Sequence, residues 1–125
     1  MKSVNLIFPH QLFQESPLFE TNSTIYLVEE YLFFKQYKFH QQKIAFHRAT
    51  MKAYADYLTN IKRFKVNYIE SINKASDVKE LLLLLKKEGV EQVGYVDPTD
   101  NWLQKRIEST CSRLGIKTMV HESPL

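Results

Sequence analysis

Cysteine and glycine are scarce in this chain of 125 residues, and their scarcity excludes several kinds of site. The single cysteine, Cys111, cannot form an internal disulfide or a multi-cysteine metal centre, which fits a reducing, cytoplasmic setting. Only three glycines are present, and none follows the first predicted strand, so a glycine-rich phosphate loop is excluded there. A G-x-S-x-G nucleophile elbow is missing as well, and the four histidines lack the spacing of a zinc site.

Long apolar runs and a strong charge of one sign are also missing. The longest apolar run, Leu81–Leu85, is far too short to cross a bilayer, and no signal peptide is visible at the start. The net charge is +3, which falls well short of the dense basic surface of a self-sufficient nucleic-acid binder. We therefore expect no membrane partner, and we do not expect this chain to bind DNA by itself.

What the chain does contain is a regular alternation of strand-like and helix-like segments. Strands are predicted over Ser3–Phe8, Thr24–Glu29, Lys65–Ile69, Gln92–Val96 and Ile116–Val120, and helices over Gln41–Lys62, Asp77–Glu88 and from Thr99 or Asp100 to Leu114. This order is typical of a five-stranded, mostly parallel, doubly wound α/β sheet of the Rossmann-like class, covered by helices on both faces. We expect residues 1–120 to form one domain and residues 121–125 to begin a linker.

The helix over Gln41–Lys62 has the clearest period. Its buried positions are predicted at Ile44, Arg48, Met51, Ala55 and Leu58, widened by Phe46, Ala49, Ala53 and Tyr57. Cys111, in the last helix, is expected to be a small buried apolar residue.

Candidate site residues follow from the rule that open parallel sheets bind ligands beyond the carboxyl ends of their strands, where the strand order reverses. The ends of the first, second and fourth strands and the start of the long helix should border one crevice. The candidate ligand-binding residues are Pro9, His10, Gln11, Leu12, Glu29, Glu30, Phe33, Tyr37, His40, Lys43, His47 and Asp97.

Each group of candidates has a second interpretation. Glu29 and Glu30 could accept hydrogen bonds from ring N–H or hydroxyl groups of a ligand, or they could be two solvated carboxylates at a strand end. His40 and Lys43 could form a polar wall of the crevice, or they could cap the helix and face solvent. Aromatic residues such as Phe33 and Tyr37 could stack on a planar ligand, or they could pack over a sheet edge or against another domain.

Three segments carry a resemblance to a known family. They are Leu6-Ile7-Phe8-Pro9-His10-Gln11-Leu12, Val28-Glu29-Glu30 with Phe33-Phe34, and Phe39-His40-Gln41-Gln42-Lys43-Ile44-Ala45-Phe46-His47-Arg48-Ala49. Together they resemble the start of the deoxyribodipyrimidine photolyase-related proteins, which are similar to bacterial cryptochromes and (6-4) photolyases with an iron–sulfur cluster. The resemblance covers nearly the whole chain. Many members have Gly-Asp where this chain has Pro9-His10, which leaves the identity of a ligand open.

The resemblance implies an amino-terminal α/β domain that can hold an antenna chromophore, a lumazine in some members. For the sheet we predict the strand order 3-2-1-4-5. In such proteins a carboxy-terminal helical half binds FAD, damaged DNA and a four-cysteine iron–sulfur cluster. With one cysteine this chain cannot carry the cluster, and it should lack the FAD pocket. The expected partner is its own carboxy-terminal FAD domain, with DNA bound only by the full-length protein. The tail near Pro124 favours a trimmed domain over a naturally split protein.

Three hypotheses about function are open at this point. The leading one is a domain that positions an antenna, or acts as a scaffold, in a flavoprotein for light-driven DNA repair or photoreception. By itself the domain is not expected to be catalytic, whereas its parent could be a DNA photolyase. The second is a small stand-alone enzyme with His10, His40 or Glu30 as general acid or base, although no activated nucleophile is visible. The third is a domain that serves only for interaction and could dimerise.

Overall fold

A computed structural model gives the fold of the chain. It describes residues 2–8, 11–12, 18, 23–29, 41–70, 76–97 and 101–122, without the side chains of 41–47 and 101. The elements in chain order are β1 (Ser3–Ile7), β2 (Thr24–Val28), α2 (Gln41–Asn60), β3 (Val66–Ile69), α3 (Val78–Lys87), β4 (Gln92–Val96), α4 (Asn101–Leu114) and β5 (Lys117–His121).

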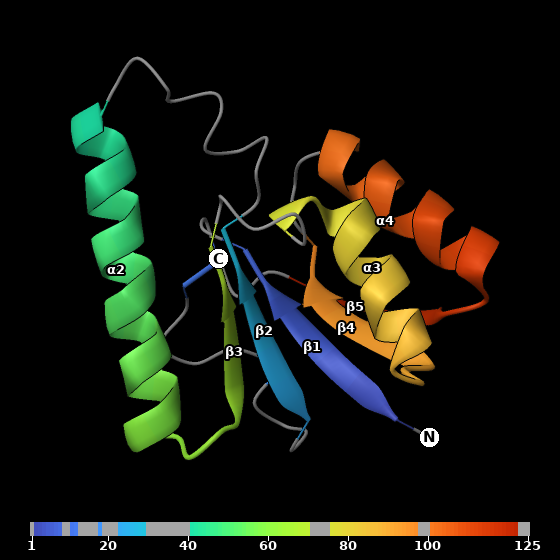
Figure 1. Ribbon diagram of the computed structural model, residues 1–125, viewed down its shortest axis with the longest axis horizontal. Coiled ribbons are helices and arrows are strands. Elements are labelled where there is room, and N and C mark those ends of the chain that lie inside the picture. The colour runs from blue at the N-terminus through green and yellow to red at the C-terminus, as the bar shows by residue number, and fades with distance from the viewer. Residues whose placement is uncertain are drawn as a thin grey trace.

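The five strands form one parallel sheet in the order β3-β2-β1-β4-β5. Helix α2 covers one face, over β2 and β3, and helices α3 and α4 lie together on the other face (Figure 1). The predicted fold class and strand order are therefore confirmed. Because every strand pair is parallel, all the carboxyl ends lie at one edge of the sheet. We call this the carboxyl edge.

Two apolar clusters hold the helices against the sheet, and β1 contributes to both because its side chains alternate between the faces. Val4, Leu6 and Phe8 belong to the cluster under α3 and α4, whereas Ile7 belongs to the cluster under α2. The α3–α4 cluster also contains Cys111, which is 1% exposed, as expected from the sequence.

Helix α3 begins and ends where its sequence indicates. The Asp77 side chain accepts a hydrogen bond from the Lys79 backbone N–H at 3.0 Å and so caps the first turn. At the other end Gly89 has a φ of +88°, a left-handed conformation that glycine adopts without strain. The Val90 N–H then donates to the Leu85 carbonyl at 3.0 Å, which closes the helix end.

The centre of the sheet is tightly built where β1 meets β4. Asn5 lies opposite Gly94, and a Cβ atom at position 94 would overlap the Asn5 side-chain oxygen. The Asn5 amide is 95% buried and donates to the Leu18 carbonyl at 3.4 Å. Glycine is therefore required at position 94, because the Asn5 amide fills the space beside it and contacts Leu18 of the β1–β2 connection.

The predicted bounds differ from the observed ones by at most two residues at any element end that the structure describes. Inside α2 the prediction was partly wrong: Ala49 and Ala53 are exposed, whereas Tyr54 is 8% exposed and packs in the α2 cluster. Alanine carries too little apolar surface to fix the rotation of the helix, so the larger Met51, Tyr54 and Leu58 decide which face is buried. Within the described residues, no helix is long and apolar enough to cross a membrane.

Candidate functional site

Polar residues follow the strands at the carboxyl edge. Gln11 comes shortly after β1, Glu29 directly after β2, Glu70 directly after β3 and Asp97 directly after β4. The chain leaves β1 toward β2 on one side and later enters β4 on the other side, so the order of the sheet reverses between β1 and β4. This is the position at which doubly wound sheets bind ligands.

Gln11 lies at that reversal point and is 3% exposed. Its backbone N–H donates to the Phe8 carbonyl at 2.9 Å, which turns the chain at the end of β1. Its side-chain Nε2 donates to the carbonyls of Val96 at 2.8 Å and Asp97 at 3.4 Å, at the end of β4. These two acceptors fix the orientation of the amide, because a flipped amide would place oxygen against oxygen.

The other atom of this amide is different. Gln11 Oε1 is buried and accepts no hydrogen bond from any residue that the structure describes. A buried acceptor without a donor costs about 1–3 kcal/mol, so native proteins rarely leave one without a reason. Its position at the reversal point of the sheet makes this acceptor a candidate contact for a ligand that carries an N–H or O–H group.

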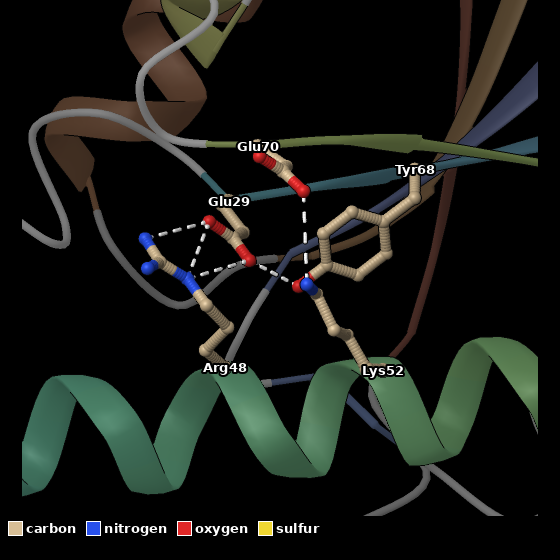
Figure 2. Close-up of polar contacts among 5 residues, drawn as sticks. All are labelled: Glu29, Arg48, Lys52, Tyr68 and Glu70. Atoms are coloured by element: carbon tan, nitrogen blue, oxygen red, sulfur yellow. Dashed lines mark hydrogen bonds and ion pairs between the residues drawn. The ribbon is translucent and has the colours of Figure 1, made fainter.

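Glu29 is fully buried, with 0% exposure, and is surrounded by donors. Arg48 of α2 places its Nε 3.3 Å from both carboxylate oxygens and a terminal guanidinium nitrogen 3.2 Å from Oε1 (Figure 2). The Tyr68 hydroxyl of β3 donates to Oε2. A carboxylate removed from water needs such compensation, and charge-assisted hydrogen bonds are the strongest available.

Tyr68 acts in this cluster as a neutral donor. Burial raises the pKa of its phenol, and the hydrogen bond to Glu29 and the charge of that carboxylate raise it further. The hydroxyl therefore keeps its proton over the physiological range and can hold Glu29 in place.

Lys52 and Glu70 close the outer side of the cluster. Lys52 Nζ lies 3.6 Å from Glu70 Oε1 and 5.8 Å from the centroid of the Tyr68 ring, and both charged side chains are about half exposed (Figure 2). Such a rim pair contributes little to stability, about 0.2–1 kcal/mol, but it covers the phenol ring.

The sequence builds this cluster by two simple periodicities. Arg48 and Lys52 are four residues apart on α2 and so share one face of the helix. Leu27 pairs with Tyr68 in the β2–β3 register, and Glu29, two residues after Leu27, points to the same face. Helix α2 covers that face, so Arg48 and Tyr68 converge on the carboxylate from two sides.

The structure brings together only part of the predicted set. Gln11 and Asp97 meet through the hydrogen bond of the Gln11 amide to the Asp97 carbonyl, and Leu12 packs beside the α2 cluster. Pro9, His10, Glu30, Phe33, Tyr37 and His40 lie outside the described residues, as do the side chains of Lys43 and His47.

For Glu29 the solvated alternative was wrong, because the carboxylate has no exposed surface. Sequence reasoning also missed Tyr68, Lys52 and Glu70. One signal was present: Arg48 recurs on the apolar face of α2, where a cation needs a buried anion, and the nearest strand ends in Glu29. Among the described residues, no group of three or more His, Cys, Asp or Glu could hold a metal ion.

The fold and this polar edge define a class: a parallel, doubly wound α/β domain with polar residues at the strand-order reversal. The comparisons with known proteins identify the family within this class. The model of the deoxyribodipyrimidine photo-lyase-related protein family matches residues 5–125, and the chain belongs to that family. It is also similar to the "Uncharacterized protein R852" of Acanthamoeba polyphaga mimivirus, at 33% identity over 131 residues. That match covers 99% of this chain but 65% of the viral protein, so the chain spans about two thirds of the length of this curated relative.

Proposed function

We propose that this domain holds a planar antenna chromophore at the carboxyl edge, between β1 and β4, as the α/β part of a photolyase-related flavoprotein. The observation that carries the proposal is the buried Gln11 Oε1 at the reversal point of the sheet, which has no hydrogen-bond partner in the described part of the chain. Membership of the family supports a light-absorbing ligand of the lumazine, deazaflavin or flavin type.

The residues present fit such a group. A heteroaromatic ring with an N–H can donate to Gln11 Oε1, whose direction is fixed by the Val96 and Asp97 carbonyls. Arg48 is 39% exposed and lies on the same side of the sheet as Gln11's neighbour Leu12. Its guanidinium suits a ring carbonyl or a phosphate.

Glu29 has a different role in this proposal from the one its sequence position suggests. Its oxygens already accept from Arg48 and Tyr68, so it serves to position Arg48 and does not contact the chromophore. A bound antenna would supply absorption and dipolar transfer of excitation to a flavin. The protein's own residues would bind the ring, orient it and exclude water. A flavin-binding domain, and DNA through that domain, are the proposed partners of the complete protein.

The test is direct binding to the purified chain. A lumazine, a deazaflavin, FMN and FAD are added separately, and visible absorbance and ligand fluorescence are followed. Gln11→Leu keeps the approximate size of the side chain and removes the acceptor together with the Nε2 donor to the β4 end. We expect it to weaken binding at least about tenfold, the effect of one lost hydrogen bond to a buried acceptor. Gln92→Leu, at the amino end of β4, is the matched control and should leave binding unchanged. If none of the four compounds binds, the antenna role is overturned.

An interaction role has its own supporting observation. Met119 and Val120 of β5 are 48% and 42% exposed at one edge of the sheet. Neighbouring residues of a strand point to opposite faces, so both faces of β5 present apolar surface. Sedimentation over a wide concentration range tests whether copies of the chain associate through it. A Met119→Lys variant should abolish any dimer that uses β5, and a strictly monomeric native chain would argue against this role.

A further inference from the structure

A hollow lies in the helical layer formed by α3 and α4. It has a volume of about 660 Å³ and is lined by Lys79, Trp102, Lys105, Arg106, Glu108 and Ser109. This size is within the range of about 300–1,000 Å³ that small-molecule sites occupy. None of these described lining residues is one of the polar residues at the carboxyl edge (Gln11, Glu29, Glu70 and Asp97), so the hollow is separate from the proposed antenna site.

One wall of the hollow is an aromatic ring beside a fixed guanidinium. The indole of Trp102 is 44% exposed, and the Arg106 guanidinium carbon lies 5.2 Å from its ring centroid. Arg106 is held from the other side by Asp77, at 2.8 and 2.9 Å to the two carboxylate oxygens. Because Asp77 also caps α3, the ring and the guanidinium are anchored to both helices.

Two further cations border the hollow, one from each helix. Lys79 in the first turn of α3 and Lys105 of α4 are exposed, and the positive ends of both helix dipoles lie near them. Trp102, Lys105 and Ser109 recur at helical spacing and share one face of α4. Glu108 also lines the hollow. One of its carboxylate oxygens accepts a hydrogen bond at 3.1 Å from Gln104, which lies one turn earlier on α4.

An exposed indole that shares a hollow with two lysines is chemically suited to a planar ring that carries a negative charge. Stacking of a base on an aromatic ring tolerates any base, and lysines next to it attract phosphate. We therefore propose that this hollow binds a nucleotide, with its base on Trp102 and its phosphate at Lys79 and Lys105. The nucleotide can be free, or it can be one unit of a single strand, and the two sources share this chemistry.

The chain reports on this site directly, because Trp102 is its only tryptophan. The purified protein is titrated with AMP, with an eight-residue single-stranded oligonucleotide and with inorganic phosphate while tryptophan fluorescence is followed. We expect quenching by AMP or by the oligonucleotide and none by phosphate. If the natural ligand is a free nucleotide, AMP and the oligonucleotide should bind with similar affinities. If it is a single strand, the oligonucleotide should bind at least about tenfold more tightly than AMP, and its affinity should fall as the salt concentration rises.

Variants locate the site. Lys79→Ala with Lys105→Ala should weaken binding about tenfold and flatten the salt dependence, since each phosphate contact contributes to the slope. Lys65→Ala with Lys117→Ala removes the same charge from exposed lysines at the amino ends of β3 and β5 and should leave binding unchanged. With a dye-labelled ligand, Trp102→Ala should lose affinity about tenfold, whereas Trp102→Phe should keep most of it.

Three results would overturn the proposal. The first is the absence of quenching by both AMP and the oligonucleotide at millimolar concentration. The second is an equal loss of affinity in the two double-lysine variants, which would show a general charge effect. The third is full affinity in Trp102→Ala with the fold intact by circular dichroism. None of these depends on antenna binding, so this proposal and the proposed function can fail separately.

Discussion

Among the described residues, two arginine–carboxylate pairs differ in which partner is buried. In the Glu29–Arg48 pair the carboxylate is 0% exposed and the arginine 39%, whereas in the Asp77–Arg106 pair the carboxylate is 32% exposed and the arginine 19%. The second pair is shorter, at 2.8 Å against 3.2 Å. Geometry alone would therefore rank Asp77–Arg106 as the stronger pair.

Burial reverses that ranking for the effect of removing one partner. Glu29 would be left as a charge without water, and of the two donors described above only Tyr68 would remain. Asp77 would keep contact with solvent and with the Lys79 N–H. The cost of breaking an ion pair depends on the environment of the group that stays behind, and the distance between the partners matters less.

The largest expected effect comes from Arg48→Met, which keeps the apolar stem and removes the charge. We expect a loss of about 3 kcal/mol in the free energy of unfolding, because the buried Glu29 carboxylate loses its cation. Urea denaturation followed by circular dichroism measures it. The double variant Glu29→Leu, Arg48→Met should recover most of the loss. A loss of less than about 1 kcal/mol in the Arg48→Met variant would mean that the buried Glu29 carboxylate does not need the charge of Arg48.

Tyr68→Phe removes a second donor to Glu29 and is expected to cost about 1–3 kcal/mol at pH 7. Tyr95 provides the matched control, since its hydroxyl is buried and has no hydrogen-bond partner among the residues described. Tyr95→Phe should be neutral or slightly stabilising, because it removes an unsatisfied polar group. Equal losses for the two variants would contradict the role given to the Tyr68–Glu29 hydrogen bond.

The same tyrosines predict a pH dependence. Burial raises the pKa of Tyr68 above its ordinary value of 10.0, with Glu29 adding to the rise, and burial raises that of Tyr95 to about 12. Above pH 10 the unfolded chain releases these protons while the folded chain keeps them, so folding becomes less stable as pH increases. Urea midpoints between pH 8.5 and 11 should fall, and each Phe variant should flatten the fall. A midpoint that does not change over this range would contradict both shifts.

The fold was predictable because it depends on features that local sequence carries. The Asp77 cap, the turn at Gly89 and the apolar periods of α3 appear in short windows, and the strand order follows once the family resemblance is recognised. For the candidate site, the sequence predicted the location but not the contacts. Gln11, Glu29 and Asp97 follow strands and so were placed at the carboxyl edge, but their partners were not.

The partners depend on tertiary geometry. Tyr68 reaches Glu29 because β3 pairs with β2 in a particular register, and no local pattern fixes that register. The interpretation of Glu29 as solvated failed for the same reason, since burial of a strand end depends on the helix packed over it. Ala49 and Ala53 were misplaced because a helical period can be drawn through several faces when small residues are counted as apolar.

The partly buried Asp77–Arg106 pair can be analysed further by two substitutions of Asp77. Asp77→Asn keeps a good capping side chain but removes the charge that holds Arg106, whereas Asp77→Ala removes both. We expect a loss of about 1 kcal/mol or less for Asn and about 1–2 kcal/mol for Ala, each smaller than for Arg48→Met. Thermal unfolding of the three variants side by side tests the order. A larger loss for Asp77→Asn than for Arg48→Met would mean that ion-pair distance, and not burial of the carboxylate, determines the cost.

The smallest effect is expected at the rim of the buried cluster. Lys52→Ala breaks an ion pair at 3.6 Å between two half-exposed side chains, and such pairs contribute about 0.2–1 kcal/mol at low salt. The loss of stability in Lys52→Ala should vanish at 0.5 M salt, where exposed charges are screened. The loss of stability in Arg48→Met should persist, because the buried Glu29 has no contact with the ions in solution. Salt dependence thus separates two cations that lie only one helical turn apart on α2. An equal response to salt in both variants would mean that the Glu29 carboxylate is reached by solvent.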